Sequence, residues 1–367
     1  MRTVVVIGGY GNFGQVISRR LAALPNVQLI VAGRDAGKAR LLADSIGARG
    51  EAIDSNDPKL AETLKRLGAH VAIHCAGPFQ RADYRVARAA IDAGTHYIDI
   101  ADGRRFVSDI TTLDNAARDA GVAVVSGASS VPALSSAVVD AHLHAFSRLD
   151  SIDTGISASE KIPGSATVAG VLSYVGKTID VLRDGKRSQV IGWQGLRRER
   201  FGAPAGKRWL GYCDVPDLEL FPLRYKQVQT VSFSAGLGLS VTHLGTWFLS
   251  GLTRAGLLRR PEKFASRLGR LAQLLERFGN GTSAMYVRMS GIGKNGEDIT
   301  RRWQLIAQDN DGIHIPCLAA VALCRKLVGS DVVDPGARAC VGLLSLDEYL
   351  AELEGLSIQV SSESETN

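Results

Sequence analysis

The stretch Thr3-Val-Val-Val-Ile-Gly-Gly-Tyr-Gly-Asn-Phe-Gly14 decides the fold of this chain. Its first five residues, all β-branched, predict a buried parallel strand. The strand runs into a G-x-G-x-x-G turn made by Gly9, Gly11 and Gly14, and a helical pattern follows that stops at Pro25. A bare G-x-G-x-x-G is a weak signal in a chain with 40 glycines. In this strand–turn–helix context it predicts a dinucleotide-binding turn.

Each glycine of the turn has its own physical role. Gly9 permits the tight turn, Gly11 leaves room for a pyrophosphate, and Gly14 lets the helix approach the strand closely. The N-terminus of the following helix offers N–H groups and a partial positive charge to the phosphates. The expected cofactor contacts in the turn are Gly9, Tyr10, Gly11, Asn12, Phe13 and Gly14. The alternative is a glycine turn with a purely structural role.

The next 110 residues alternate between strand and helix patterns. The further strands are expected at Gln28–Ala32, Glu51–Asp54, Val71–Cys75, Tyr97–Ile100 and Val122–Val125. One of the intervening helices should start with Asp57 as its cap and Pro58 as its first residue. Another is outlined by apolar residues from Phe106 to Ala120. Six strands alternating with helices predict an α/β fold, a Rossmann doubly wound parallel sheet.

The end of the second strand bears on the choice of dinucleotide. NAD-preferring sites place an Asp or Glu there, which bonds the ribose 2′-hydroxyl. This chain has Gly33 and Arg34 instead, and a guanidinium suits a 2′-phosphate. We therefore expect NADP, with NAD still possible, and we also place Asp54 among the cofactor contacts. Asp35 lies one residue later and could cap the next helix instead of binding the ribose. The alternative for Arg34 is a solvated charge on a loop, with no role in binding.

Composition describes an ordinary globular protein of more than one domain. A chain of 367 residues is too long for one Rossmann unit. The net charge of +6 is modest, the basic residues are scattered, and nothing favours nucleic acid as a partner. Five dispersed cysteines without metal spacing suit a reducing cytosol. We expect a cytoplasmic protein with no signal peptide, no metal and no membrane partner. The apolar window Leu237–Leu252 is too short and polar to span a bilayer and predicts a core or interface helix.

After residue 130 the pattern becomes α+β. Strands are expected at Ser151–Ser159, Ser188–Trp193 and Val228–Gly236, and helices at Leu134–Phe146, Thr167–Leu182, 239–257, 262–278, Ile315–Val328 and Leu346–Leu353. Asn295-Gly296 predicts a hairpin between Thr282–Ser290 and Ile299–Gln308. The stretch Gly195–Pro222 has the composition of a loop.

These patterns divide the chain into four parts. Residues 1–130 are the expected NAD(P)-binding Rossmann domain, and residues 131–310 an α+β substrate and dimerisation domain. Residues 311–356 are expected to form a helical segment that returns to the Rossmann domain. Residues 357–367 are expected to be a flexible tail, because they are polar and terminal.

Two motifs carry a family resemblance. Cys75-Ala-Gly-Pro-Phe79 and Ala93-Gly-Thr-His-Tyr-Ile-Asp99 together resemble the saccharopine dehydrogenase (saccharopine reductase-like) family. Asp214–Leu218 and Gly336–Cys340 are similar to later segments of that family. The resemblance implies an NADP-binding Rossmann domain, a central α+β domain that often forms a dimer, and a C-terminal segment returning to the first domain. Members with known chemistry reduce an imine formed between an amine and an aldehyde, or run the reverse oxidation.

The chain departs from the family pattern at two places. Family members often have an acidic residue after a glycine just past the fifth strand, where this chain has Ala101-Asp102-Gly103. Many relatives carry an Asp near the Val-Pro pair past the sixth strand, where Ser126–Pro132 offers only hydroxyls. Both places border the expected nicotinamide position, so they bear on the substrate and on the proton-transfer group.

Ligands of such sheets bind beyond the carboxyl ends of the strands. After the fourth strand, the expected positioning residues are Ala76, Gly77, Pro78 and Phe79. Asp102 is the first choice for a proton relay or for holding an ammonium group; the alternative is a helix cap ahead of Phe106. Arg104 and Arg224 are candidates for binding a substrate carboxylate.

The combined prediction is an NADP-dependent oxidoreductase acting on a C=N or C=O bond of a small amino-acid-like substrate, or on the reverse reaction. The protein is expected to act as a homodimer. One alternative is a non-catalytic dinucleotide-binding sensor or scaffold, which the missing family acids make credible. The other is an enzyme like dihydrodipicolinate reductase, which would not explain the turn Ala76–Phe79.

Overall fold

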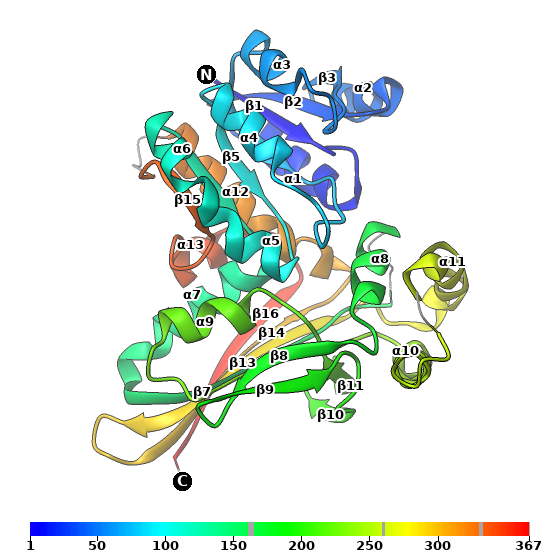
Figure 1. Ribbon diagram of the computed structural model, residues 1–367, viewed down its shortest axis with the longest axis vertical. Helices are drawn as coiled ribbons and strands as arrows, with labels where there is room; N and C mark the ends of the chain where they lie inside the picture. The colour runs from blue at the N-terminus through cyan, green and yellow to red at the C-terminus, as the bar shows by residue number, and fades with distance from the viewer. Residues whose placement is uncertain (161–164, 259–260, 330–332, 367) are drawn as a thin grey trace. The chain divides into compact units, whose positions relative to one another are not determined.

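The computed structural model describes residues 1–160, 165–258, 261–329 and 333–366 (Figure 1). The chain divides into two compact units. The first comprises Met1–Leu134 and His314–Glu352, and the second Ser135–Ile313 and Leu353–Asn367. The sequence predicted boundaries at residues 130, 310 and 356, and the two units change after residues 134, 313 and 352.

The first unit is built on a parallel sheet of seven strands in the order β15-β6-β5-β4-β1-β2-β3. The strands are β1 (Arg2–Ile7), β2 (Val27–Gly33), β3 (Arg49–Ala52), β4 (Ala69–His74), β5 (His96–Asp99), β6 (Ala123–Ser126) and β15 (Gly336–Ala339). The order 3-2-1-4-5-6 is that of a Rossmann fold. The predicted α/β fold class is confirmed.

Helices complete the first unit. They are α1 (Asn12–Ala22), α2 (Ala36–Ser45), α3 (Leu60–Arg66), α4 (Arg85–Asp92), α5 (Arg104–Ser108), α6 (Asp114–Asp119), α12 (Ile315–Val328) and α13 (Leu346–Ala351). On one face of the sheet, buried residues such as Val5 and Ala72 pack with Leu64 of α3 and Ala90 of α4. Helix α12 contacts α1, β4 and β5. The C-terminal segment thus forms part of the core around the first sheet.

Three local predictions in this unit were wrong. Helix α3 starts at Leu60 and not at Pro58, because Asp57 accepts a hydrogen bond from the backbone N–H of Lys59 and closes a separate turn (2.9 Å). The helix expected from Phe106 to Ala120 is split into α5, a 3₁₀ turn and α6. The C-terminal segment, expected to be helical, also supplies strand β15, so the sheet has seven strands and not six.

The second unit contains a sheet of nine strands. Seven follow the order β10-β11-β12-β7-β13-β14-β16, while β8 pairs with both β12 and β9. The strands are β7 (Phe146–Ser157), β8 (Thr178–Arg183), β9 (Lys186–Ile191), β10 (Arg197–Arg200), β11 (Lys207–Tyr212), β12 (Thr230–Gly236), β13 (Ser283–Gly293), β14 (Asp298–Ala307) and β16 (Ile358–Thr366). The helices are α7 (Ser135–His142), α8 (Ser165–Ser173), α9 (Asp217–Arg224), α10 (Ser240–Arg254) and α11 (Ala265–Leu275).

The hairpin predicted around Asn295-Gly296 is confirmed. Strands β13 and β14 pair in antiparallel register from Ser283↔Ala307 to Ile292↔Asp298. Gly296 adopts a φ of 89°, a conformation that glycine supplies without strain.

Other predictions for the second unit were wrong. The stretch Gly195–Pro222, expected to be a loop, contains β10, β11 and α9. The helix expected at Thr167–Leu182 ends at Ser173 and is followed by strand β8. The tail expected to be flexible forms β16, which pairs with β14 from Ile299↔Thr366 to Ala307↔Ile358; residue 367 lies outside the described residues. An unpaired edge of β14 offers these polar residues backbone partners, which composition alone does not reveal.

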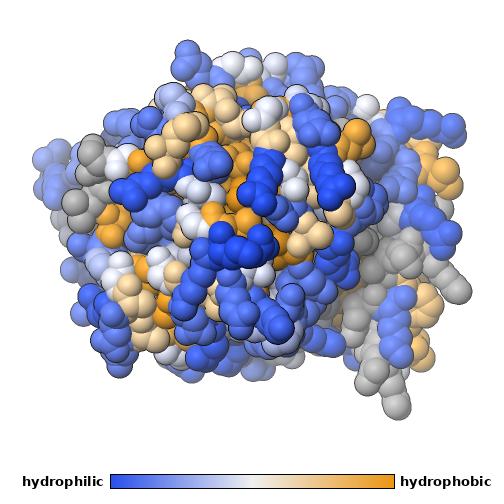
Figure 2. Space-filling model, turned by 90° about the horizontal axis from the view of Figure 1, so that it is seen from above, coloured by the Kyte–Doolittle hydropathy of each residue, from blue (hydrophilic) through white to orange (hydrophobic). Residues whose placement is uncertain are grey.

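The apolar window around residues 237–252 forms α10, which is not a core helix. Val241 and Phe248 are each 62% exposed, and the buried residues in the helix are His243 and Ser250. In the part of the chain that the structure describes, no helix is both long and apolar enough to cross a bilayer. Figure 2 shows mostly hydrophilic residues over the visible face, with hydrophobic ones in small groups between them.

Candidate functional site

The glycine turn packs tightly on its inner side and is open on its outer side. A Cβ on Gly14 would lie 2.1 Å from the carbonyl oxygen of Gly8, and one on Gly9 would lie 2.8 Å from that of Val6. A Cβ on Gly11 would meet a single atom within 4 Å, the Gly8 oxygen at 3.2 Å. Two glycines therefore bring α1 close to β1, and the third leaves free space above the turn.

The free space lies at the N-terminus of α1. Gly11 is the N-cap residue, and no described side chain caps the helix through a hydrogen bond. The first turn of α1 contains no acidic residue that would compete for its partial positive charge. An uncapped helix N-terminus beside an open glycine turn is the arrangement that binds a pyrophosphate. The residues present thus fit a dinucleotide.

The end of β2 contacts the turn through Tyr10. Its hydroxyl accepts a hydrogen bond from the backbone N–H of Asp35 (3.0 Å), and its ring lies against Gly33. The Asp35 carboxylate accepts from the N–H of Lys38 and caps α2, as the alternative for this residue expected. Arg34 is exposed, and its guanidinium has no hydrogen bond or ion pair with any described residue. The cation at this strand end is available to a ligand.

Asp54 follows β3 at the same edge of the sheet. Its carboxylate accepts hydrogen bonds from the backbone N–H (2.9 Å) and the side-chain amide (3.2 Å) of Asn56. The preceding residue, Ile53, donates its N–H to the carbonyl of Gly33 (3.0 Å). Asp54 thus shapes a turn next to the end of β2.

The segments after β1, β4 and β5 touch one another. A Cβ on Gly8 would lie 3.0 Å from the backbone nitrogen of Ala76, and one on Gly103 would lie 3.2 Å from the carbonyl carbon of Phe79. The peptide between Gly77 and Pro78 is cis. Residues Ala76–Phe79 therefore lie between the glycine turn and the turn after β5, where their backbone borders the edge expected to bind the cofactor.

Phe79 faces the interior. Its side chain is 5% exposed, and its ring packs against those of His74 (5.1 Å between centroids) and Phe106 (5.3 Å). The expected role of Phe79 in positioning the cofactor stays a prediction. What the structure shows is that its ring anchors the loop after β4 to the core.

Asp102 lies at the surface of this edge. Its carboxylate accepts a hydrogen bond from the amide of Gln80 (2.9 Å), and partial loss of hydration raises its pKa against the opposing effect of this bond. Gly103, and not Asp102, is the N-cap residue of α5, so the helix-cap alternative was wrong. Arg104 is the first residue of that helix.

Arg224 belongs to the second unit and is already paired. It forms an ion pair with Asp140 (2.6 Å), and the Tyr225 hydroxyl donates to the same carboxylate (2.8 Å). Its place is at the end of α9, where it joins that helix to α7.

Asp99, the last residue of β5, is a buried carboxylate at this edge that was not among the residues predicted from sequence. Its Oδ1 accepts from the backbone N–H groups of Ala101 (2.9 Å) and Gly127 (2.8 Å) and from the Ser126 hydroxyl (2.9 Å). The side chain is fully buried, and burial raises its pKa to about 6 against the opposing effect of these bonds. Asp99 therefore ties the turns after β5 and β6 together. The feature of the sequence that could have indicated its role is a carboxylate at the end of an otherwise apolar strand.

A second buried polar pair lies beside it. Nδ1 of His74, at the end of β4, is 3.1 Å from the Tyr97 hydroxyl on β5. Burial lowers the pKa of His74 to about 4, so the ring is neutral at pH 7. The described residues contain no group of three or more His, Cys, Asp or Glu arranged to hold a metal ion.

Comparison with known proteins agrees with this geometry. Residues 4–125 match the family model of the saccharopine dehydrogenase NADP binding domain. Over these residues the chain is similar to the NADP-binding domain of the saccharopine dehydrogenase family. The match covers β1 to β6, including the glycine turn and the Ala76–Phe79 loop. No curated protein matches the chain.

Two solved structures share the fold over almost the whole chain. Saccharopine dehydrogenase (L-Glu forming) from Saccharomyces cerevisiae is 14% identical, with a TM-score of 0.71, and the alignment covers 99% of this chain and 100% of that one. Homospermidine synthase from Legionella pneumophila, solved in complex with NAD, is 9% identical, with a TM-score of 0.63 and coverage of 99% and 91%. At these identities the similarity shows the fold of the saccharopine dehydrogenase-type chain and not its substrate.

Proposed function

We propose that this protein is an NADP-dependent oxidoreductase of the saccharopine dehydrogenase type. It transfers a hydride to or from a C=N or C=O bond of a small amino-acid-like substrate. The observation that carries the proposal is the open glycine turn at the uncapped N-terminus of α1, with Arg34 exposed at the end of β2. The family match over residues 4–125 supports it.

The preference for NADP is argued from Arg34. A 2′-phosphate bound there gains a charge-assisted hydrogen bond from the guanidinium. Asp35, the nearest carboxylate in sequence, is engaged in capping α2, so no acid of β2 or its following turn is committed to a ribose 2′-hydroxyl. The Legionella homospermidine synthase was solved with NAD, so the preference is proposed from this chain's own residues.

The bound cofactor supplies the hydride chemistry, and the chain's residues position the reactants. The turn at Gly9–Gly14 and the first turn of α1 hold the pyrophosphate. The backbone of Ala76–Phe79 borders the reacting end of the site. Asp102, oriented by Gln80, moves the one proton that the reaction requires or holds a substrate ammonium group. Arg104, two residues along, binds a substrate carboxylate.

We favour an active enzyme over a non-catalytic sensor because of one observation. A sensor needs no proton-transfer group, whereas Asp102 lies at the carboxyl edge with a raised pKa and with Gln80 as its orienting partner. The family match also counts against an enzyme of the dihydrodipicolinate reductase type, because it includes the Ala76–Phe79 loop.

Cofactor binding is the first test. NADPH and NADH are titrated into the protein while nicotinamide fluorescence is followed. Gly11→Val should weaken NADPH binding at least about tenfold at an unchanged melting temperature, because its side chain fills the space above the turn. Gly251→Val is the matched control, since a Cβ there meets no atom within 4 Å. If neither nucleotide is retained at millimolar concentration, the proposal fails.

Turnover and assembly are tested separately. NADPH oxidation is screened against mixtures of amines with keto acids or aldehydes, and NADP reduction against amino-acid-like amines. Light scattering measures the mass of the protein in solution, and we expect that of a homodimer. The exposed apolar side chains of α10, Val241 and Phe248, are compatible with a contact between copies.

A further inference from the structure

The sheet of the second unit contains a fork. Strand β12 pairs along one edge with β7, from Thr230↔Ser151 to Gly236↔Ser157. On its other edge two strands share it. Strand β11 pairs with its C-terminal end (Tyr212↔Ser234), and β8 pairs near its N-terminal end (Val231↔Leu182). Where β8 and β11 diverge, the structure has a cavity of about 200 Å³.

The lining of this fork cavity combines apolar and cationic groups. Val181, Val190 and Phe233 are buried residues that contribute apolar surface. Arg183 lines the cavity from β8 and Arg197 from β10. For scale, an apolar cavity of about 150 Å³ accommodates benzene. The fork cavity therefore has room for a small organic molecule with one charged end.

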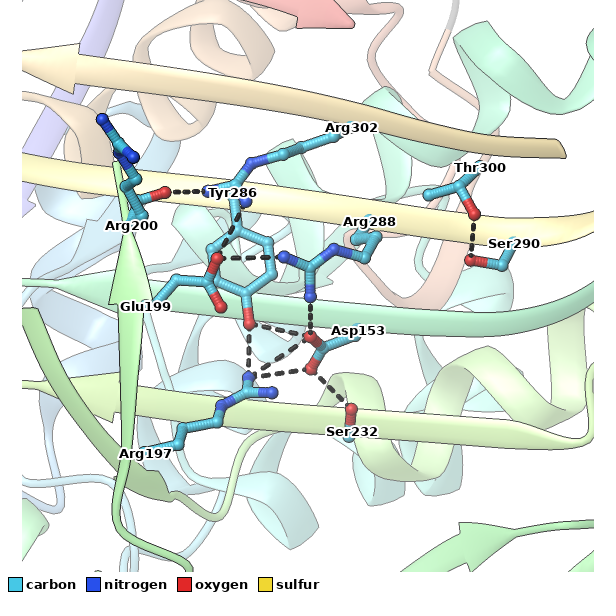
Figure 3. Close-up of polar contacts among 10 residues, drawn as sticks. All are labelled: Asp153, Arg197, Glu199, Arg200, Ser232, Tyr286, Arg288, Ser290, Thr300 and Arg302. Carbon is cyan, nitrogen blue, oxygen red and sulfur yellow. Dashed lines mark hydrogen bonds and ion pairs between the residues drawn. The ribbon is translucent and has the colours of Figure 1, made fainter. Parts of the chain in front are cut away.

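Arg197 is only partly satisfied by the protein. Its Nη2 donates to both oxygens of Asp153 (3.1 and 3.3 Å) and to the Tyr286 hydroxyl (Figure 3). Its Nε is buried and has no acceptor among the described residues. A buried N–H of a charged group without an acceptor is costly, so an additional acceptor would be stabilising.

The neighbouring carboxylates do not balance the positive charge of the arginines around them. Asp153 also accepts hydrogen bonds from Arg288 (3.1 Å) and Ser232 (2.6 Å). Glu199 is shared by Arg288 (2.9 Å) and Arg302 (2.8 Å). Figure 3 shows this group as one connected network. The network contains three guanidinium groups, those of Arg197, Arg288 and Arg302, against the two carboxylates of Asp153 and Glu199, which leaves one positive charge in excess.

Arg183 adds a second cation to the lining. Its Nη2 donates to the hydroxyl of Tyr212, a neutral partner (3.2 Å). No carboxylate of the described residues forms an ion pair with it. The fork cavity is thus bordered by Arg183, which has no ion pair with a described carboxylate, and by Arg197, whose network with Asp153 and Glu199 has one positive charge in excess.

We propose that the fork cavity binds a small organic carboxylate. Arg183 and Arg197 bind the carboxylate group, and the surface of Val181, Val190 and Phe233 contacts the hydrocarbon part. This assigns the second unit a binding site of its own, in addition to the proposed dinucleotide site of the first. The apolar lining favours a carboxylate with a short carbon chain over a fully hydrated inorganic anion.

Calorimetric titration of the full chain with butyrate tests the proposal. We expect saturable binding with one site per chain, weaker binding of sulfate, which has the charge alone, and none of butan-1-ol, which has the hydrocarbon alone. Arg183→Gln should weaken butyrate binding about tenfold or more, because a charge-assisted hydrogen bond is lost. Arg183→Lys should give an intermediate affinity, since it keeps the charge without the planar fork.

Arg187→Gln is the matched control. Arg187 lies opposite Leu182 in the same β8–β9 hairpin, is exposed and does not line the cavity. Its replacement should leave butyrate binding unchanged. Absence of saturable binding, sulfate binding as tight as that of butyrate, or equal losses in the Arg183 and Arg187 variants would each overturn the proposal. NADPH titration of Arg183→Gln, expected to match the wild type, keeps this test separate from that of the dinucleotide site.

Discussion

The ring of Tyr10 lies across Gly33, and its hydroxyl accepts a hydrogen bond from the N–H of Asp35 at 3.0 Å. A Cβ on Gly33 would be 2.4 Å from Cε1 of that ring. The second residue of the glycine turn is thereby held against the end of β2. Two segments that the sequence connects separately to the cofactor, one to its pyrophosphate and one to its ribose, are joined by this contact.

Gly33→Ala should therefore destabilise the protein through Tyr10. The new methyl group forces the ring to move, and the hydrogen bond to Asp35 is lost or strained. In a double-mutant cycle with Tyr10→Ala, we expect a coupling free energy on the order of 1 kcal/mol, measured by urea unfolding. An equal cost of Gly33→Ala in both backgrounds would contradict the contact's role.

Arg34→Asp should change the cofactor preference. The guanidinium is replaced by a carboxylate that repels a 2′-phosphate, so NADPH binding should weaken about tenfold to a hundredfold while NADH binding changes little. Fluorescence titration of both nucleotides measures the effect. Arg66→Asp, at the end of α3, is the matched change of charge and should alter neither affinity. An unchanged NADPH preference would refute the assignment of Arg34.

Asp102→Asn should lower turnover on an identified substrate. The amide accepts and donates hydrogen bonds but does not take up the proton, so we expect kcat to fall roughly a hundredfold, with NADPH affinity unaffected. The pH profile is a second readout. Because partial loss of hydration raises the pKa of Asp102, the wild type should show an acidic limb that the variant lacks. Asp92→Asn, at the exposed end of α4, is the control, and full activity of Asp102→Asn would exclude the proton relay.

Asp99 should stabilise the protein through its hydrogen bonds more than through its negative charge. Asp99→Leu removes the acceptor for the N–H groups of Ala101 and Gly127 and for the Ser126 hydroxyl, so three buried donors lose this partner. We expect a loss on the order of 3 kcal/mol in the free energy of unfolding. Asp99→Asn keeps an oxygen at this position and should cost clearly less. Similar losses for the two variants would show that the three hydrogen bonds are not the cause.

Asp217 should make stability depend on pH. It is 1% exposed at the start of α9, and burial raises its pKa to about 7, against an ordinary value of 3.8. Between these two values the folded state binds more protons than the unfolded state, so this group's contribution to stability falls as the pH rises. Asp217→Asn should gain on the wild type over this range by about 1–4 kcal/mol in urea unfolding. A constant difference between the two proteins from pH 4 to pH 8 would contradict the raised pKa.

The local patterns were most informative where neighbouring residues decide the outcome. The strand–turn–helix around Gly9–Gly14 and the hairpin at Asn295-Gly296 depend on a few consecutive residues with special backbone requirements, and both are confirmed. The start of α3 was predicted less accurately, because Asp57-Pro58 is equally typical of a turn and of the first residues of a helix. The hydrogen bond from Lys59 to Asp57 decides between them.

The candidate site was foreseen only in part, for a related reason. The glycine turn and Arg34 could be picked out from the sequence because their order along the chain predicts that they lie at the same edge of the sheet. Asp99 was not, since its three donors come from two turns that the sheet brings together. Arg197 belongs to a stretch expected to be a loop, so its network with Asp153 and Tyr286 had no signal in the sequence.

The sequence by itself determined the Rossmann domain of this protein. Alternating strands and helices bury their apolar residues by forming a parallel sheet with helices on both faces, and the glycine turn lies between the first strand and the first helix. Only the tertiary structure decided that Gly336–Ala339 becomes a seventh strand beside β6 and that the polar C-terminus becomes a strand beside β14. These segments have little apolar periodicity of their own. Each is a strand because a distant edge offers its backbone hydrogen-bond partners, and local sequence does not reveal where such an edge lies.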